Sequence, residues 1–529
     1  MHDSDVKDED RALAATAFDA EFYLSRNPDV AEAGMDALEH FLSGGWRENR
    51  DPSRKFSIAS YLDLNEDVAR LGVNPLLHYL AFGHAENRLV RLDLGFRYDI
   101  LRNAPTLEAR LETDRPHDIA GERIEGLAAA FALLGQRLFI TVSHDAYVDS
   151  VGGVQLCLKR EAAALAEGGW SHLHLYPAVP SPVSDFETLD PVMGVVIDGR
   201  KCGLFEASKI AAAILAVQKA QPFKTVGFAI HSLLGHSIPS VSTVLVNAGA
   251  NAGFLWLHDQ ASLCASYTLL RNDVAFCGAP SIDSQACSIC VYGLRRRVQV
   301  ADHMAFFEQF AVTVLAPSQA QLDLWLASSA YPAAAVHVHP HAVLNPRSGA
   351  AVLAPDGPLR VAFLGFPANH KGWPIFAALA AQFADDPRYH FLHLGKQGDE
   401  PPAIDFIAVD PPNDIGDQMT NAMVQAVEAA GIDVALILSI CPETFCFTAH
   451  EAVAAGAAVV AFADSGAVAR FAAQPGRGQV ISSEPELTAL FATGEIIALS
   501  RAARNPPLFD LHYSQMTADF IDLTVGAIP

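Results

Sequence analysis

The chain has 529 residues, which is too long for one ordinary core and indicates about three domains. Hydrophobic residues make up 51% of it and charged residues 18%, a balance typical of packed globular proteins and not of disordered chains. The 60 acidic residues outnumber the 36 Lys and Arg residues, and the formal net charge of −24 argues against nucleic acid as a partner. An anionic ligand would therefore need a local basic pocket.

The acidic N-terminal stretch, Met1 to Arg11, lacks the basic region, apolar stretch and cleavage site of a signal peptide. No stretch reaches the roughly 18 uninterrupted apolar residues that span a bilayer. We therefore expect a cytoplasmic protein without a transmembrane segment, and peripheral contact with the inner face of the membrane stays open. In that reducing compartment, clustered Cys residues are expected to be metal ligands or buried thiols.

Residues 1–88 contain two copies of a 38-residue repeat and are expected to form a small helical module. The residues that recur 38 positions later are Phe18, Tyr23, Leu24, Asn27, Asp29, Val30, Ala31, Gly34, Leu38, His40, Leu42, Gly45, Glu48, Asn49 and Arg50. Each copy is predicted to hold two short helices, the second closed by Gly45 or Gly83. The recurring Asn, Asp, His and Arg residues are expected to cap and pack, so we interpret the module as a docking or oligomerisation unit.

A linker over residues 89–136, with a helix near 125–134, is expected to lead into alternating strands and helices. A first α/β domain is predicted over residues 137–350, with strands at 138–143, 172–176, 194–197, 225–230, 253–257, 312–316 and 336–339. A second is predicted over residues 351–505, with strands at 359–365, 390–395, 406–409, 434–439, 458–463 and 480–482. The Pro- and Gly-bearing stretch 346–358 would separate the two sets, and residues 506–529 are predicted to form a C-terminal helix and tail.

This order of elements predicts an α/β fold of two Rossmann-like, doubly wound domains that face a cleft, preceded by the small all-α repeat module. Open parallel sheets bind ligands at the carboxyl ends of their strands. We therefore expect the functional site in the cleft between the two α/β domains.

The most specific motif contains two glutamates in an E-x7-E spacing, Glu443 and Glu451. An apolar strand over 434–438 is predicted to deliver Glu443 into a loop, and a helix beginning near Phe445 would carry Glu451 about two turns further on. Both carboxylates could then face one cleft and bind sugar hydroxyls. Between them, the free backbone N–H groups of the helix N-terminus suit a phosphate.

This element resembles the E-x7-E motif of the family 4 retaining glycosyltransferases, which have the GT-B fold of two facing Rossmann-like domains. The Glu-Ala-x-Ala-Ala-Gly continuation that starts at Glu451 also matches that family. The resemblance implies that Glu443 is catalytic and contacts the donor sugar, that Glu451 binds the nucleotide ribose, and that Thr444, Phe445 and Cys446 belong to the donor site. Cys446 departs from the Gly or Pro that the family commonly has.

A second loop resembles the diphosphate grip of that family. The strand 359–364 is followed by Lys371-Gly372 at the start of a helix. The resemblance implies that Lys371 neutralises the donor diphosphate as a point charge beside a helix N-terminus. Phe366 stands where the family often has an Arg, so phosphate binding would depend on fewer cations.

Gly152 and Gly153 open a helix after the strand 138–143 and resemble the Gly-Gly loop of the family, in which the backbone approaches the donor phosphate and the acceptor. A plain turn is the alternative. The pair lacks the G-x-G-x-x-G spacing of a dinucleotide-binding fold, which argues against a dehydrogenase.

His258 follows an apolar strand at the edge of the predicted cleft. It resembles the active-site His of the family, which implies a catalytic role in binding sugar hydroxyls or in steadying charge at the anomeric carbon. His231 and His236 follow another strand end and are second-rank candidates for lining the cleft, and His339 and His341 rank below them.

The loop 264–290 carries four thiols, Cys264, Cys277, Cys287 and Cys290, and the last two form a C-x-x-C pair. Their number satisfies the ligand count of a structural zinc site. The alternatives are reduced thiols with no metal, or an iron–sulfur cluster, for which the spacing is less familiar. We interpret the adjoining cationic run 295–297 as a solvated helix face, with contact to a diphosphate-lipid or a membrane headgroup as the alternative.

The resemblance implies a retaining glycosyltransferase that moves a sugar from a nucleotide-sugar donor to a bacterial glycan or lipid-linked acceptor, with no cofactor required for the transfer. The N-terminal repeats resemble units that precede glycosyltransferase domains in bacterial surface-polysaccharide enzymes, which implies a role in polysaccharide biosynthesis. The alternatives are a nucleotide-sugar epimerase or a phosphorylase on the same fold, or a non-catalytic glycan- or partner-binding protein that retains it.

Overall fold

A computed structural model of the chain describes residues 7–53, 55–86, 88, 90, 96–97, 100, 124–185, 188–288, 290–350, 357–409, 421–501 and 506–521. It divides into two compact units, one of residues 1–105 with 283–291 and one of residues 106–282 with 292–529. Most of the predicted linker lies outside the described residues, and its described end forms α10 (Ile124–Phe131), close to the predicted helix. Among the described helices, none combines the length and the apolar character that crossing a bilayer requires.

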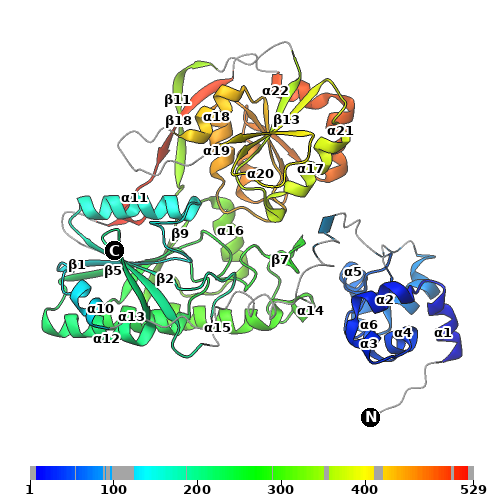
Figure 1. The fold of residues 1–529 in the computed structure, drawn as a ribbon, viewed down its shortest axis with the longest axis horizontal. Helices are drawn as coiled ribbons and strands as arrows, with labels where there is room; N and C mark the ends of the chain where they lie inside the picture. Colours follow the sequence, from blue (N-terminus) through cyan, green and yellow to red (C-terminus); the bar gives the residue numbers. More distant parts are fainter. Residues whose placement is uncertain are drawn as a thin grey trace. The chain divides into compact units, whose positions relative to one another are not determined.

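The two sequence repeats fold into the same succession of elements (Figure 1). After α1 (Asp8–Ala15), the first copy forms α2 (Ala20–Arg26), α3 (Pro28–Glu32), α4 (Ala37–His40) and the π-helical turn η1 (Phe41–Gly45). The second copy forms α5 (Ile58–Leu64), α6 (Glu66–Leu71), α7 (Pro75–His78) and η2 (Tyr79–Gly83). Their apolar faces share one core, which includes Tyr23, Phe41, Ile58 and Tyr61.

The recurring polar residues make the same contacts in both copies. The Tyr23 hydroxyl lies 2.9 Å from His40 Nδ1, and the equivalent Tyr61 and His78 atoms are also 2.9 Å apart. Arg50 pairs with Asp29 in the first copy, as Arg88 pairs with Asp67 in the second. These residues recur because each one orders a turn or joins two short helices, as the sequence predicted.

The N-terminal α/β domain is built on an eight-stranded sheet with the order β10-β9-β6-β5-β1-β2-β3-β4. The strands are β1 (Arg137–Val142), β2 (Ser171–Pro177), β3 (Val192–Ile197), β4 (Arg200–Glu206), β5 (Thr225–Ile230), β6 (Ala252–Trp256), β9 (Ala311–Ala316) and β10 (Ala335–Val338). The prediction of a wholly parallel sheet is wrong at one edge, where β3 runs antiparallel to both of its neighbours, β2 and β4. The strand β4 was not predicted, because three of its seven residues are charged.

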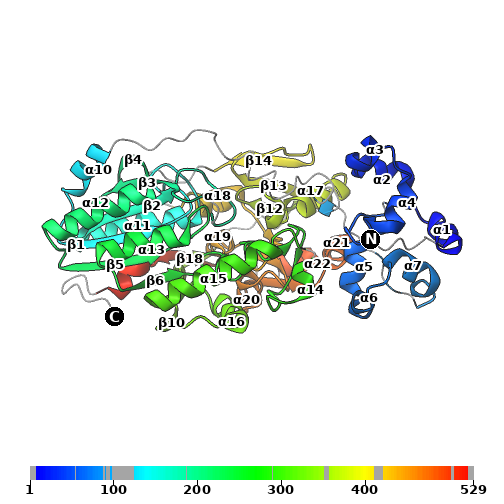
Figure 2. The same cartoon turned by 90° about the horizontal axis from the view of Figure 1, so that it is seen from below.

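Helices cover both faces of this sheet. Figure 1 shows α11 (Gly153–Glu167) on one face, and Figure 2 shows α12 (Ala207–Ala220), α13 (Ile238–Ala248) and α15 (Gly293–Gln309) side by side on the other. The domain also contains α16 (Gln319–Ser328) and a small hairpin of β7 (Leu270–Arg271) and β8 (Ala275–Phe276). The short α14 (Gln285–Ser288) belongs to the smaller unit.

The C-terminal α/β domain is built on a six-stranded sheet with the order β14-β13-β12-β15-β16-β17, in which every pairing is parallel. Its strands are β12 (Leu359–Leu364), β13 (Tyr389–Gly395), β14 (Ile404–Ala408), β15 (Val434–Ile437), β16 (Ala458–Phe462) and β17 (Gly478–Ile481). Its helices are η3 (Asn369–Lys371), α17 (Trp373–Gln382), α18 (Ala422–Ala430), α19 (Phe447–Ala454), α20 (Ala467–Ala472), α21 (Glu484–Thr493) and α22 (Glu495–Arg501). The two α/β domains confirm the predicted fold class.

The C-terminal segment differs from the prediction. Instead of a helix, it forms β18 (Pro507–Tyr513), which pairs antiparallel with β11 (Ala342–Ala350) in the stretch that was predicted to be a separator. Leu344, Phe509 and Leu511 pack against the core of the C-terminal α/β domain. The alternation of apolar and polar side chains in this ribbon suits a strand with one covered face. A short 3-10 helix, η4 (Met516–Phe520), follows, and residues 522–529 lie outside the described part.

Candidate active site

A cavity of about 390 Å³ lies between the two α/β domains and is lined by both. The residues that line it from the N-terminal domain are His144, Val154, Pro180, Ser181, Pro182, Leu234, His258, Asp259, Gln260, Tyr267 and Thr268. Those that line it from the C-terminal domain are His370, Lys371, Cys441, Pro442, Glu443 and Thr444. The cavity is therefore the cleft that the sequence predicted.

Strand order explains why these loops meet. In the C-terminal sheet the order reverses between β12 and β15, and the loops after these two strands carry Lys371 and Glu443. In the N-terminal sheet it reverses between β1 and β5, where the loop after β1 supplies His144 and the loop after β5 supplies Leu234. Both reversals are switch points, the places where open α/β sheets bind ligands.

Glu443 is fixed through its backbone as well as its side chain. Its N–H donates to the Ser465 carbonyl at 3.1 Å, and its carbonyl accepts from the Ala467 N–H at 2.9 Å. The carboxylate accepts from Lys371 Nζ at 2.6 Å and from the Ser439 hydroxyl at 2.5 Å. Three segments of the C-terminal domain therefore hold Glu443 at the cavity wall.

In the pair of Glu443 and Lys371, each group stabilises the charged form of the other. Burial alone would raise the pKa of Glu443, but Lys371 and the Ser439 hydroxyl outweigh it and hold that pKa below its usual value. Burial alone would lower the pKa of Lys371, but Glu443 outweighs it and the pKa is raised. The Lys371 side chain remains 41% exposed while that of Glu443 is 8% exposed. Lys371 can therefore contact an anionic ligand without leaving Glu443.

His258 faces this pair from the N-terminal domain, but its ring already has protein partners. Its Nε2 lies 2.9 Å from His231 Nδ1, and its Nδ1 lies 3.1 Å from His341 Nε2. Its carbonyl accepts the Thr444 hydroxyl at 2.9 Å, a hydrogen bond between the two α/β domains. Burial lowers the pKa of His258 well below its ordinary value, so the ring is neutral.

The structure brings four of the predicted site residues to the cavity wall, namely His258, Lys371, Glu443 and Thr444. The predicted donor residues Gly152, Gly153, Phe445, Cys446 and Glu451 are not among its lining residues. Gly152, Gly153 and Phe445 are close to it along the chain, because Val154 and Thr444 line the cavity, whereas Glu451 lies two turns further along α19.

The N-termini of α11 and α19 approach each other closely. A Cβ atom on Gly153 would lie 3.4 Å from the Phe447 ring, an ordinary van der Waals distance. Cys446 is the N-cap of α19, where its thiol sulfur lies 3.2 Å from the Thr448 hydroxyl. Phe445 turns away from the cleft and lines a second cavity of about 460 Å³ with Arg470 and Arg477.

Glu451 lies on α19, as predicted, and binds a neighbouring amide. Its Oε1 accepts from Asn421 Nδ2 at 3.0 Å, and the same amide donates to the Tyr513 hydroxyl at 2.6 Å. Burial raises the pKa of Glu451 to about 7. Its contact with a nucleotide ribose stays a prediction.

Among the histidines ranked below His258, the structure separates two kinds. His231 and His341 contact His258 directly, whereas His236 donates to the Ser143 carbonyl at 2.8 Å and has a structural role. The sequence reasoning missed the lining residues Asp259 and Tyr267. Asp259 directly follows His258 at a strand end, and that position was the available signal.

The four predicted zinc ligands are divided between the two compact units, with Cys264 and Cys277 in the larger and Cys287 and Cys290 in the smaller. Over the part of the chain that the structure describes, no three His, Cys, Asp or Glu side chains gather as a metal site. The zinc site stays a prediction that rests on the spacing. Arg296 is buried and its Nε donates to the Leu263 carbonyl at 3.0 Å, which differs from the predicted solvated helix face.

No protein-family model matches the sequence, and no curated protein matches it. Among solved structures, a sucrose-phosphate synthase from Thermosynechococcus elongatus is 15% identical, with 70% of this chain and 91% of that chain covered and a TM-score of 0.44. The pneumococcal O-GlcNAc transferase GtfA, in complex with UDP and GlcNAc, is 10% identical over 70% of this chain and 94% of that chain, with a TM-score of 0.42. The lipopolysaccharide outer core galactosyltransferase WaaB is 11% identical over 68% and 91%, with a TM-score of 0.41. At this level of similarity, function has to be inferred from the residues of the site.

Proposed function

We propose that the protein is a retaining glycosyltransferase that uses a nucleotide-sugar donor. The observation that carries this proposal is the carboxylate of Glu443, held by Lys371 and Ser439 at the switch point of one α/β domain and facing His258 of the other. A cation for a diphosphate and a fixed carboxylate for sugar hydroxyls lie on one wall of a single cleft. That combination supports glycosyl transfer better than hydride transfer, for which the sequence offers no dinucleotide loop.

In the proposed reaction, Lys371 and the N-terminus of α19 neutralise the donor diphosphate and stabilise it as the leaving group. Glu443 orients the sugar while the bond from the anomeric carbon to the phosphate oxygen breaks and positive charge develops on the ring. The acceptor hydroxyl attacks from the face that the phosphate leaves, a new glycosidic bond forms, and the hydroxyl proton passes to the departing phosphate oxygen. The lysine and the helix N-terminus supply the positive charge for this step.

The direct test is Glu443→Gln, which keeps the shape of the side chain and removes its charge. We expect transfer to fall by at least about 100-fold, the usual size of a lost electrostatic contact to the reacting centre, while the protein still folds. Glu495→Gln, on the exposed start of α22, is the matched control and should transfer sugar as the wild type does. Unchanged turnover in the Glu443→Gln protein would contradict the assignment.

Three measurements separate the proposed transferase from its alternatives. A thermal-shift screen against nucleotide-sugars should raise the melting temperature with the true donor, because a ligand that binds the native state stabilises it. Conversion of a nucleotide-sugar without any acceptor would indicate an epimerase instead. Absence of binding to every nucleotide-sugar by calorimetry would indicate a non-catalytic binding protein.

The finer parts of the proposal rest on the sequence alone. We propose a bacterial glycan, lipid-linked or polymeric, as acceptor, a cytoplasmic location at the inner face of the membrane, and docking or oligomerisation through residues 1–88. Sedimentation of the full chain tests the last point, since a monomer at all concentrations would exclude self-association. We also propose a structural zinc in the loop 264–290, and less than about half an equivalent of metal in protein purified without chelator would contradict it.

A further inference from the structure

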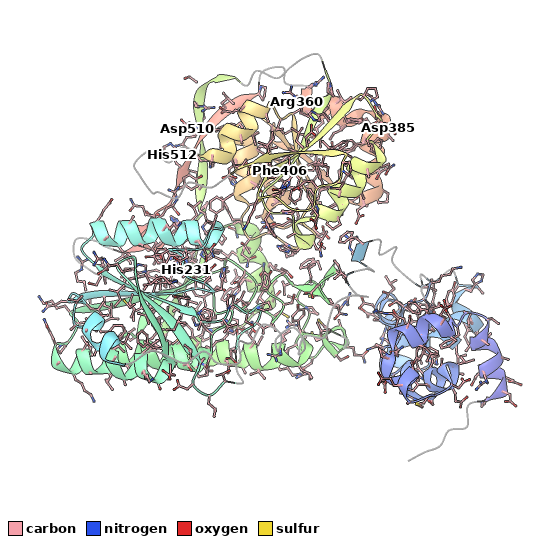
Figure 3. All side chains as sticks on the ribbon, viewed as in Figure 1. His231, Arg360, Asp385, Phe406, Asp510 and His512 are labelled. Carbon is pink, nitrogen blue, oxygen red and sulfur yellow. The ribbon has the colours of Figure 1, made fainter. Side chains whose placement is uncertain are left out.

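A continuous row of hydrogen bonds leads from the interior of the N-terminal α/β domain to His258 at the cleft. It begins at Glu161 on α11, whose Oε2 lies 2.6 Å from His231 Nε2. It continues through His231 Nδ1 to His258 Nε2, and from His258 Nδ1 to His341 Nε2. Glu161, His231 and His341 are buried, and only His258 is partly exposed at the cavity (His231 is labelled in Figure 3).

Glu161, the inner end of this row, accepts a hydrogen bond on each of its two carboxylate oxygens. The second oxygen of Glu161, Oε1, accepts the backbone N–H of Thr517 at 2.9 Å. Burial alone would raise the pKa of Glu161, but His231 and the Thr517 N–H outweigh it and hold the pKa below its usual value, so the group is a carboxylate. An ionised carboxylate only accepts hydrogen bonds, and His231 Nε2 must therefore carry a proton.

The far end of the row, His341, decides which nitrogen carries the proton in each of the other rings. If His231 is neutral, His258 donates from Nε2 and His341 donates from Nε2, and His341 Nδ1 is a bare lone pair. If His231 carries two protons, the order reverses and His341 Nδ1 holds a proton. That atom is buried and has no hydrogen-bond partner among the described residues. Buried N–H groups without an acceptor are rarer than buried acceptors without a donor, so the first order is favoured.

We propose that Glu161 and His231 are positioning residues that hold His258 as a neutral imidazole with its proton on Nε2 and its Nδ1 as an acceptor. The inference rests on the proposed function and adds two residues to its site. In this order, the dipoles of His231 and His258 align with their negative ends pointing away from Glu161, and aligned hydrogen bonds polarise one another. The row thus keeps His258, its one member at the cavity wall, uncharged, whereas a doubly protonated His258 would repel the positive charge that develops on the donor sugar.

The proton position is read directly from long-range proton–nitrogen NMR spectra of the full chain labelled with nitrogen-15 in histidine. The signals of His258 are assigned by their loss in His258→Gln. We expect the pattern of an imidazole protonated on Nε2 at pH 7. A pattern with the proton on Nδ1, or on both nitrogens, would overturn the inference. This readout does not depend on activity, and wild-type protein that transfers no sugar would refute the proposed function while the spectrum still decides the proton position.

Glu161→Gln tests the positioning role. The Thr517 N–H needs an acceptor, so the new amide should turn its oxygen to Thr517 and its NH₂ to His231, which reverses the row and moves the His258 proton to Nδ1. We expect kcat to fall by about 10- to 100-fold, as when an outer partner that orients a site imidazole is lost, with the donor KM within about threefold of wild type. Glu167→Gln, exposed on the same helix, should change neither kcat nor the spectrum. A Glu161→Gln protein with the wild-type proton position and kcat would refute the role, and if it does not fold, the wild-type spectrum alone decides.

Discussion

Glu443 is 8% exposed, and an ionised carboxylate at that depth is tolerated because Lys371 and Ser439 both donate to it. The ammonium group of Lys371 has three donors, of which Glu443 uses one. An anion that enters the cleft can therefore bind Lys371 while the ion pair persists. The same residue both orders the carboxylate and receives the leaving group, so its removal should affect donor binding and turnover together.

Glu451 gives a prediction about pH. Its pKa is near its usual value of about 4.5 in the unfolded chain and is raised by burial to about 7 in the folded protein. Between these values the folded state holds a proton that the unfolded state has lost, so the free energy of unfolding should fall as the pH rises from about 4.5 to about 7. The shift sets an upper limit of about 3 kcal/mol on this loss.

The measurement compares wild type with Glu451→Gln, which cannot ionise, by denaturant unfolding at pH 4.5 and pH 8. The variant should gain stability relative to wild type as the pH rises, and Glu495→Gln should not. A difference between wild type and Glu451→Gln that is independent of pH would contradict the raised pKa.

At the scale of the element, the repeat module depends on two glycines as well as on its apolar residues. The turn η1 ends at Gly45, where a Cβ atom would lie 2.1 Å from the Tyr23 hydroxyl, and in the second copy a Cβ on Gly83 would lie 2.3 Å from the Tyr61 hydroxyl. Each tyrosine hydroxyl forms a hydrogen bond with a histidine of its own copy. The sequence predicts each of these glycines as a helix cap, but glycine is also required there because a tyrosine side chain occupies the space that a Cβ atom would need.

Gly45→Ala should displace the Tyr23 hydroxyl and separate it from His40. We expect a loss of about 1–3 kcal/mol in the stability of the module, as for other overpacked sites. Gly44→Ala is the matched control, because nothing lies within 4 Å of a Cβ at that neighbouring position. Hydrogen exchange of peptides from residues 18–50 in the full chain measures the effect, and equal protection in both variants would contradict it.

At the scale of the whole molecule, the chain crosses between the two α/β domains more than once. It leaves the N-terminal domain through β11, returns through β18, and ends its described part with η4 against α11. There Met516 and Ile521 join the core that contains Trp256, and the indole N–H donates to the Thr517 hydroxyl at 2.9 Å. The segment after β18 thus completes the N-terminal domain next to Glu161.

Thr517→Val should leave the buried indole N–H of Trp256 without an acceptor. We expect a loss of about 1–3 kcal/mol in the free energy of unfolding, the usual penalty for such a group. In a Trp256→Phe background the same substitution should have almost no effect, because no donor remains to be satisfied. Equal losses in the two backgrounds, measured by denaturant unfolding, would show that the hydrogen bond contributes nothing.

Local patterns were sufficient for much of this protein. Buried parallel strands need continuous apolar runs, so the strands that deliver His258, Lys371 and Glu443 could be placed from the sequence, and with them the cleft. The repeats and the E-x7-E spacing are likewise properties of the sequence itself. They determined the two α/β domains and the residues from which a site was to be expected.

Other features were decided only by the tertiary structure. The contact between Glu161 and His231 joins residues 70 positions apart, and the bond from Thr517 to Glu161 spans 356 positions. The strand β18 depends on β11, a partner that lies far from it in the sequence. The antiparallel hairpin of β3 and β4, by contrast, has a local signal in its Asp198-Gly199 turn, which the strand prediction did not use. Hydrogen bonds between distant segments form because packing brings single donors and acceptors together, and that process leaves no periodic pattern in the sequence.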